Sequence, residues 1–125
     1  TAAELDGLLA ELSDPRSALQ RYPSIFRRSL ENGNRLCLGS FMAAEFSDLP
    51  AAVKAEVQAF ADVNVAWLSK VLSAIGDGDA IASNAHARAI FAAVSGAQLL
   101  ARSRADVALF DGLIETYRGT GLLPA

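Results

Sequence analysis

The stretch "AAVKAEVQAFADVNVAWLSKVLSAI", residues 51–75, decides the fold class of this chain. Its large residues recur at alternating spacings of four and three, which is the period of an amphipathic helix. Pro50 suits the start of a helix, and "GDGD" at 76–79 is a strong loop signal. The stretch therefore predicts one long helix with a broad buried face. The face comprises Val53, Val57, Phe60, Asn64, Trp67 and Val71, widened by Ala61, Leu68 and Leu72.

The remainder of the chain also reads as helix. Alanine is the commonest residue and the strongest helix former, and no stretch alternates with a period of two. We expect further helices at 3–12, 15–30, 35–46, from Ser83 or Asn84 to 104, and 106–117. Pro23 should kink or split the second of these near Tyr22. The predicted fold is all-α, with five or six antiparallel-packed helices in one domain, 1–125.

Composition narrows the function classes. The formal net charge is -3 and the pI is near 5.0, so the chain offers no basic face for nucleic acid. Hydrophobic residues make up 52% of the chain, a surplus that hints at apolar surface for a ligand or partner. One cysteine excludes an internal disulfide and fits a reducing compartment, so we expect a cytoplasmic protein. No apolar run is long enough for a membrane span.

Candidates for chemistry are few. Cys37 is a potential nucleophile, but the only histidine, His86, lies on another predicted helix, so an inert buried thiol is the better interpretation. One histidine and one cysteine do not make a zinc site, and "GDGD" lacks the ligand pattern of a calcium loop. No glycine motif fits a phosphate. We expect no enzyme activity, no metal and no cofactor.

Apolar recognition is what remains. The helices at 15–30, 35–46 and 51–75 carry residues that would line a ligand pocket between them: Tyr22, Phe26, Cys37, Phe41, Phe46, Asn64 and Trp67. The alternative is that these residues simply fill a core. Asn64 lies within the apolar stripe, and a buried amide must be hydrogen-bonded, so it either bonds a neighbour, fixes the register or faces a ligand.

The predicted fifth helix is rich in small residues, at positions 85, 89, 92, 93, 96 and 97. Small side chains allow another helix to approach closely, either within one domain or across a symmetric dimer interface. We expect a homodimer, because two helices with much apolar surface end this short chain. Its interface would comprise Ile90, Ala93, Val94, Ala97, Leu99, Val107, Phe110 and Ile114.

Two segments resemble one known family. "NRLCLGSFMAAEFSDLPAAVKAEVQAFADVNVAWLSKVL", residues 34–72, resembles the ligand-binding half of TetR/AcrR-type transcriptional regulators. "AIFAAVSGAQLLARSRADVALFDGLIE", residues 89–115, resembles the two closing helices of that family. The order of the motifs is more specific than any single motif. The basic helix-turn-helix module with which such regulators begin matches nothing in this sequence.

The resemblance implies a C-terminal effector-binding and dimerisation domain of a repressor. Residues 1–14 would be the end of a connector helix, 15–75 the pocket helices, and 83–118 the helices of a four-helix bundle between two chains. A small apolar or aromatic effector would relieve DNA binding, and operator DNA would be contacted only through the missing N-terminal module. Cys37 lies where some relatives carry a cysteine, which adds a thiol-sensor interpretation. The alternative is a stand-alone helical small-molecule binding module with no DNA partner.

Overall fold

The computed structural model describes residues 5–7, 14–32, 48, 50–76 and 78–124. Four long helices account for most of them: α2 (Pro15–Glu31), α4 (Ala51–Ile75), α5 (Ala80–Arg104) and α6 (Val107–Gly119). Residues 5–7 are also helical, and no strand occurs within the described ranges. The predicted all-α fold is confirmed. The helix predicted at 35–46 lies outside the described residues, as does most of the one predicted at 3–12.

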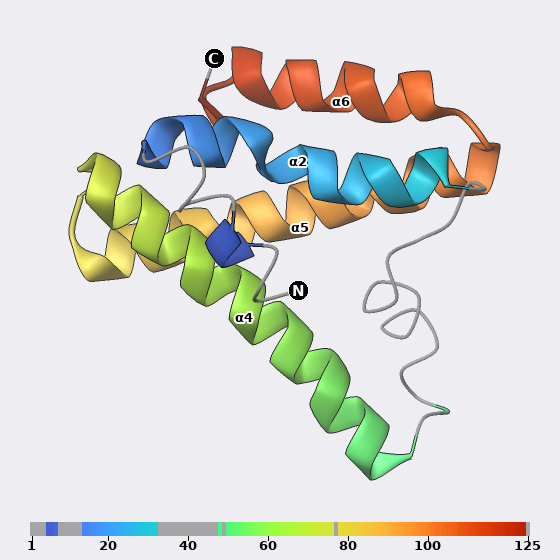
Figure 1. Cartoon of the computed structure of the whole chain (residues 1–125), viewed down its shortest axis with the longest axis horizontal. Helices are drawn as coiled ribbons and strands as arrows, with labels where there is room; N and C mark the ends of the chain where they lie inside the picture. Colours follow the sequence, from blue (N-terminus) through green and yellow to red (C-terminus); the bar gives the residue numbers. More distant parts are fainter. Residues whose placement is uncertain (1–4, 8–13, 33–47, 49, 77, 125) are drawn as a thin grey trace.

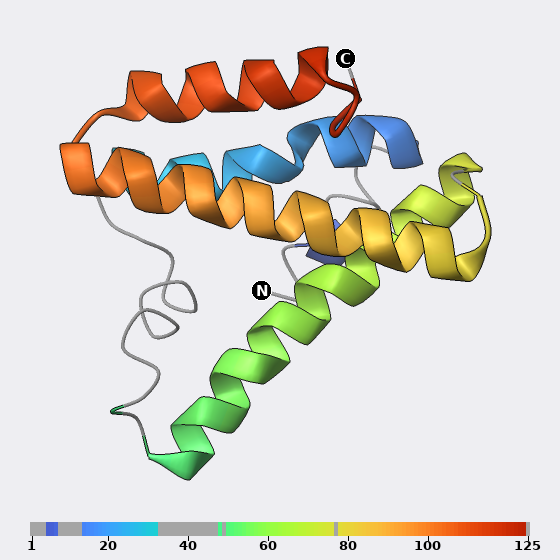
Figure 2. The same cartoon turned by 180° about the vertical axis from the view of Figure 1, so that it is seen from behind.

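The helix α5 is the centre of the arrangement, because it packs against α4, α6 and α2. Figure 1 shows α6 running antiparallel to both α5 and α2, while α4 crosses them obliquely with its first turns projecting from the bundle. Seen from behind, α5 lies in front of α2 (Figure 2). One side of α2 therefore faces α4 and α5, and another faces α6.

Aspartates begin three of the helices. Asp14 and Asp106 cap α2 and α6, as their sequence positions predict. The predicted start of α5 at Ser83 or Asn84 is wrong, since the cap is Asp79, whose carboxylate accepts a backbone N–H of the first turn at 2.8 Å. Within "GDGD" the last aspartate thus belongs to the helix rather than to the loop.

Pro23 lies inside α2 without splitting it. The helix is continuous over Pro15–Glu31, so of the predicted kink or split near Tyr22 the split is wrong. Proline removes one backbone donor, but its ring is buried here together with its neighbour, which supports the helix from outside. Tertiary packing therefore outweighs the local preference of this residue.

The core is a single buried cluster to which all four helices contribute. Its largest fully buried side chains include Tyr22 and Phe26 of α2, Leu68 of α4, Ile90 of α5 and Phe110 of α6. The α5–α6 corner turns through Ala105, which adopts a left-handed conformation with φ of 50°. An alanine in that conformation carries a strain that glycine would not.

Candidate functional site

A buried hydrogen bond links α2 to α4. The Tyr22 hydroxyl donates to Oδ1 of Asn64 at 2.7 Å, and Nδ2 of Asn64 donates to the Phe60 carbonyl oxygen at 2.9 Å. Tyr22 is 0% exposed and Asn64 is 2% exposed. A buried polar pair of this kind stabilises one register of two helices, because any slip leaves both groups unsatisfied. Of the roles considered for Asn64, the structure shows the bond to a neighbour.

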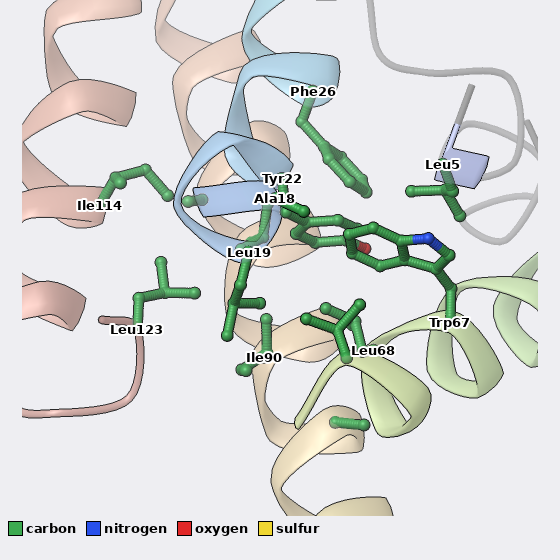
Figure 3. Close-up of a cluster of buried hydrophobic side chains, with 14 of the residues drawn as sticks. Leu5, Ala18, Leu19, Tyr22, Phe26, Trp67, Leu68, Ile90, Ile114 and Leu123 are labelled. Atoms are coloured by element: carbon green, nitrogen blue, oxygen red, sulfur yellow. The ribbon is translucent and has the colours of Figure 1, made fainter. Parts of the chain in front are cut away.

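Aromatic rings surround this bond. The Tyr22 ring stacks on Trp67 with centroids 5.8 Å apart and planes 19° apart, and it meets Phe26 at 5.4 Å in a tilted contact. Figure 3 shows the Tyr22 and Trp67 rings side by side, with Phe26 and Leu5 beyond them. We name Tyr22, Phe26, Asn64 and Trp67 the aromatic–amide cluster. Four residues predicted to lie together are therefore brought together.

One polar group of the cluster is not satisfied. Trp67 is 5% exposed, and its indole Nε1 has no hydrogen-bond partner in the part of the chain that the structure describes. In Figure 3 this nitrogen lies on the side of the ring that faces Leu5. A buried donor without an acceptor is uncommon in native proteins, so it marks a position where a further group would fit chemically.

One further polar residue beside the cluster was missed by the sequence analysis. Gln98 of α5 is fully buried, and its Nε2 donates to the Phe26 carbonyl oxygen at 3.0 Å. Its signal in the sequence was an amide within a run of small and apolar residues, the same signal that identified Asn64. The buried polar residues in the described ranges are Asn64, Ser83 and Gln98, and all three are uncharged.

The other predicted ligand-binding residues, Cys37, Phe41 and Phe46, lie outside the described residues. His86 of α5 is half-buried, with Nε2 at 2.8 Å from the Leu122 carbonyl oxygen. Over the described ranges, no group of three or more histidine, cysteine, aspartate or glutamate side chains is placed to hold a metal ion. Nor does any helix in those ranges have the length and hydropathy of a membrane span.

The structure revises the choice of interface residues. Five of the predicted positions are buried within a single chain, at 0–4% exposure: Ile90, Val94, Ala97, Phe110 and Ile114. They form the core because α5 turns this face toward α2 and α6, so they have no area left for a second chain. Ala93 and Val107 are half-buried. Leu99 is 48% exposed, and its neighbour Leu100 is 51% exposed.

A second face of these two helices is exposed, except at the half-buried Gly96. We define the outer face of α5 and α6 by the positions Ala85, Ala89, Ala92, Gly96, Leu99, Ala108 and Gly112. A Cβ atom added at Gly96 or at Gly112 would meet nothing within 4 Å. Glycine within a helix costs roughly 0.5–1 kcal/mol relative to alanine, and packing of the described residues does not explain that cost at either position.

Two cationic side chains join α2 to α6. Nε and Nη2 of Arg27 bind the Asp111 carboxylate at 2.7 and 3.0 Å, and Arg27 also pairs with Glu31. Nη2 of Arg118 donates to the Gln20 carbonyl oxygen at 3.2 Å. The hydrogen bond from Arg27 lowers the pKa of the Asp111 carboxyl below its usual value. The two-pronged geometry fixes the relative position of the two helices.

Comparison with known proteins points to one class. The fold matches the crystal structure of a TetR transcriptional regulator from Legionella pneumophila with a TM-score of 0.81 and 25% identity. The match covers 95% of this chain and 67% of that chain. No family model matches the sequence, and no curated protein does either.

The fold of this chain is thus that of a TetR-type transcriptional regulator. The recognition of such a regulator from the motifs at 34–72 and 89–115 is confirmed. The helix arrangement agrees over nearly the whole chain, although only 25% of the aligned residues are identical.

Proposed function

We propose that this chain is the effector-binding and dimerisation domain of a cytoplasmic TetR-type repressor. The observation that carries the proposal is the agreement of its helix arrangement with a TetR regulator over 95% of the chain. Residues 15–75 form the sensing part and 83–118 the dimerisation part. Operator DNA is contacted through the helix-turn-helix module with which such regulators begin.

The aromatic–amide cluster supports the sensing role. It combines large apolar rings with neutral hydrogen-bonding groups at the junction of α2 and α4, which is the usual composition of a small-molecule site. Its described members come from two different helices, so an occupant there contacts both. This composition favours an apolar or aromatic effector without a formal charge.

The outer face of α5 and α6 supports the dimerisation role. The small side chains there allow a second helix pair to approach, and the half-exposed Leu99 and Leu100 add apolar area. Gly96 and Gly112 are favoured if the backbone of a second chain lies against them. The interface of the proposed four-helix bundle is therefore this face, and not the buried residues selected from periodicity.

A physical route connects the two parts. The helix α2 presents Tyr22 and Phe26 to the cluster and, one residue later, Arg27 to Asp111 of α6. A ligand that shifts α2 therefore also acts on the helix proposed to contact the second chain. The effector favours one arrangement of the dimer by binding it more tightly than the other.

Two measurements test this proposal. Sedimentation equilibrium of the chain should give a homodimer, and Gly96→Leu should weaken it, with Ala55→Leu on the projecting end of α4 as the matched control. A thermal-shift screen of neutral aromatic compounds should give hits that Asn64→Ala removes. A monomeric chain would contradict dimerisation, and a complete absence of hits would contradict effector binding. A monomeric chain that still binds these compounds would favour the alternative function, a stand-alone small-molecule binding module.

A further inference from the structure

We infer that the effector carries a hydrogen-bond acceptor that receives the indole N–H of Trp67, and that it is uncharged. The inference rests on the proposed effector-binding function and deepens it, because it names the ligand chemistry. The acceptor is a carbonyl or ether oxygen or an aromatic ring nitrogen, attached to an apolar body. Trp67 is accordingly the residue that selects such ligands from hydrocarbons of the same shape.

The first step is the contrast among the buried polar groups around the cluster. Tyr22 donates to Asn64, Asn64 donates to a backbone carbonyl of its own helix, and Gln98 donates to a carbonyl of α2. The Trp67 indole is buried in the same place, yet it has no acceptor within the described ranges. Native interiors satisfy nearly all buried donors, so an exception beside three satisfied groups marks a position that suits the acceptor of a ligand.

The second step is the position of the indole. One face of the Trp67 ring stacks on Tyr22, which holds the ring in a fixed orientation. Its nitrogen lies on the edge directed toward Leu5 (Figure 3). An acceptor therefore reaches the nitrogen along that edge, and the apolar body attached to it is placed against leucine and phenylalanine side chains. The donor is oriented before the ligand arrives, which reduces the entropy lost on binding.

The third step concerns charge. The residues buried around the cluster within the described ranges are neutral, and Arg27 and Asp111 neutralise one another at the junction with α6. A charged ligand would have to be desolvated without a counter-charge, which is strongly unfavourable. A neutral acceptor requires only one donor, and Trp67 supplies it.

The experiment uses the 125-residue chain and two pairs of probes that differ in one carbonyl group: acetophenone with ethylbenzene, and benzophenone with diphenylmethane. Because the chain has one tryptophan, its indole N–H gives a single assignable cross-peak in a proton–nitrogen correlation spectrum. We expect a ketone to move that peak downfield and to bind about fivefold more tightly than its hydrocarbon, the effect of one net hydrogen bond. Trp67→Phe should abolish the difference between the two members of a pair.

Phe26→Leu is the matched control, since it reduces the apolar contact and removes no donor. It should weaken ketone and hydrocarbon by the same factor. Equal affinity of ketone and hydrocarbon for the unaltered chain, with no shift of the indole peak, would overturn the acceptor inference and leave effector binding intact. If neither pair binds, the proposed effector site itself fails. The indole shift is measured on the unaltered chain, so the test does not depend on how well the variants fold.

Discussion

The aromatic–amide cluster and the outer face of α5 and α6 use opposite kinds of side chain. The cluster is made of three large aromatic residues and one amide, and the buried Tyr22 hydroxyl bonds that amide. The outer face is made of alanine and glycine together with the half-exposed Leu99. Large aromatic and hydrogen-bonded groups favour one relative position of the helices that carry them. Small side chains instead allow the backbone of another helix to approach closely.

The helix α5 contributes residues to the outer face and also contacts the cluster, so the two regions can be altered separately on one helix. Its inner side carries Gln98, which bonds α2, while the adjacent Leu99 is half exposed. A single change on one side should therefore alter one property and spare the other. The following predictions exploit that separation, beginning with the largest effect.

Asn64→Ala, in the aromatic–amide cluster, should have the largest effect on stability. It removes the acceptor of the buried Tyr22 hydroxyl, and the expected loss is about 2–3 kcal/mol of unfolding free energy. Urea denaturation measures it. Tyr22→Phe alone should cost less, and adding it to Asn64→Ala should change little further, because the bond is already gone. Strictly additive losses in that cycle would show that the two side chains do not act as a pair.

Gly96→Leu, on the outer face of α5 and α6, should weaken the proposed dimer. Overpacking a close helix contact costs about 1–3 kcal/mol, so the dimer dissociation constant measured by sedimentation should rise at least about fivefold. The monomer should not be destabilised, because leucine is a better helix former than glycine and a Cβ atom here meets nothing. Gly112→Leu should act likewise. An unchanged dimer in both variants would place the interface elsewhere.

Ala105→Gly should change stability alone, because residue 105 belongs neither to the aromatic–amide cluster nor to the outer face of α5 and α6. The residue has a φ of 50° at the corner between α5 and α6, where glycine is unstrained. We expect a gain of about 0.5–1 kcal/mol in thermal or urea unfolding, with probe affinity and dimerisation unchanged. A loss of stability would mean that the alanine methyl group makes a favourable contact at the corner.

The smallest effect should come from the Arg27–Asp111 ion pair, which joins α2 to α6. Arg27 and Asp111 have side chains 38% and 47% exposed, so solvent screens them and their coupling should be about 0.5 kcal/mol, reduced further in high salt. Since folding lowers the pKa of Asp111, its contribution is present above the unfolded value of about 3.8 and is lost as the pH falls through the folded value. A double-mutant cycle with Arg27→Gln and Asp111→Asn, measured at neutral pH and again in acid, checks both points.

Helix identities and most helix ends could be predicted from sequence because they depend on local signals. Asp14, Pro50 and Asp106 stand next to the first helical residue, and the spacing around Trp67 has a helical period. The split at Pro23 was wrongly predicted because the residue is buried in the folded chain, whereas at α5 a local cap, Asp79, was overlooked in favour of Ser83 or Asn84.

Partner identity could not be predicted in the same way. The period of Ile90, Val94 and Ala97 correctly marks a buried face, but periodicity does not distinguish burial against the same chain from burial against a copy. The same limit applies to the site. The spacing places Asn64 and Trp67 on one face of a helix. Only the three-dimensional arrangement shows that the Asn64 amide is hydrogen-bonded and that the Trp67 indole N–H has no acceptor within the described ranges.

The contacts that hold α2 also bear on how the chain folds. The Arg27–Asp111 bond joins residues 84 apart in sequence, and the Gln98–Phe26 bond spans 72, whereas α4, α5 and α6 follow one another through short turns. Closing long loops is entropically slow, so the three consecutive helices should assemble first and α2 should dock onto them last. Pulsed hydrogen exchange should then find amides of α5 protected before those of α2. The helix that reports on the ligand would thus be the last part of the domain to become ordered.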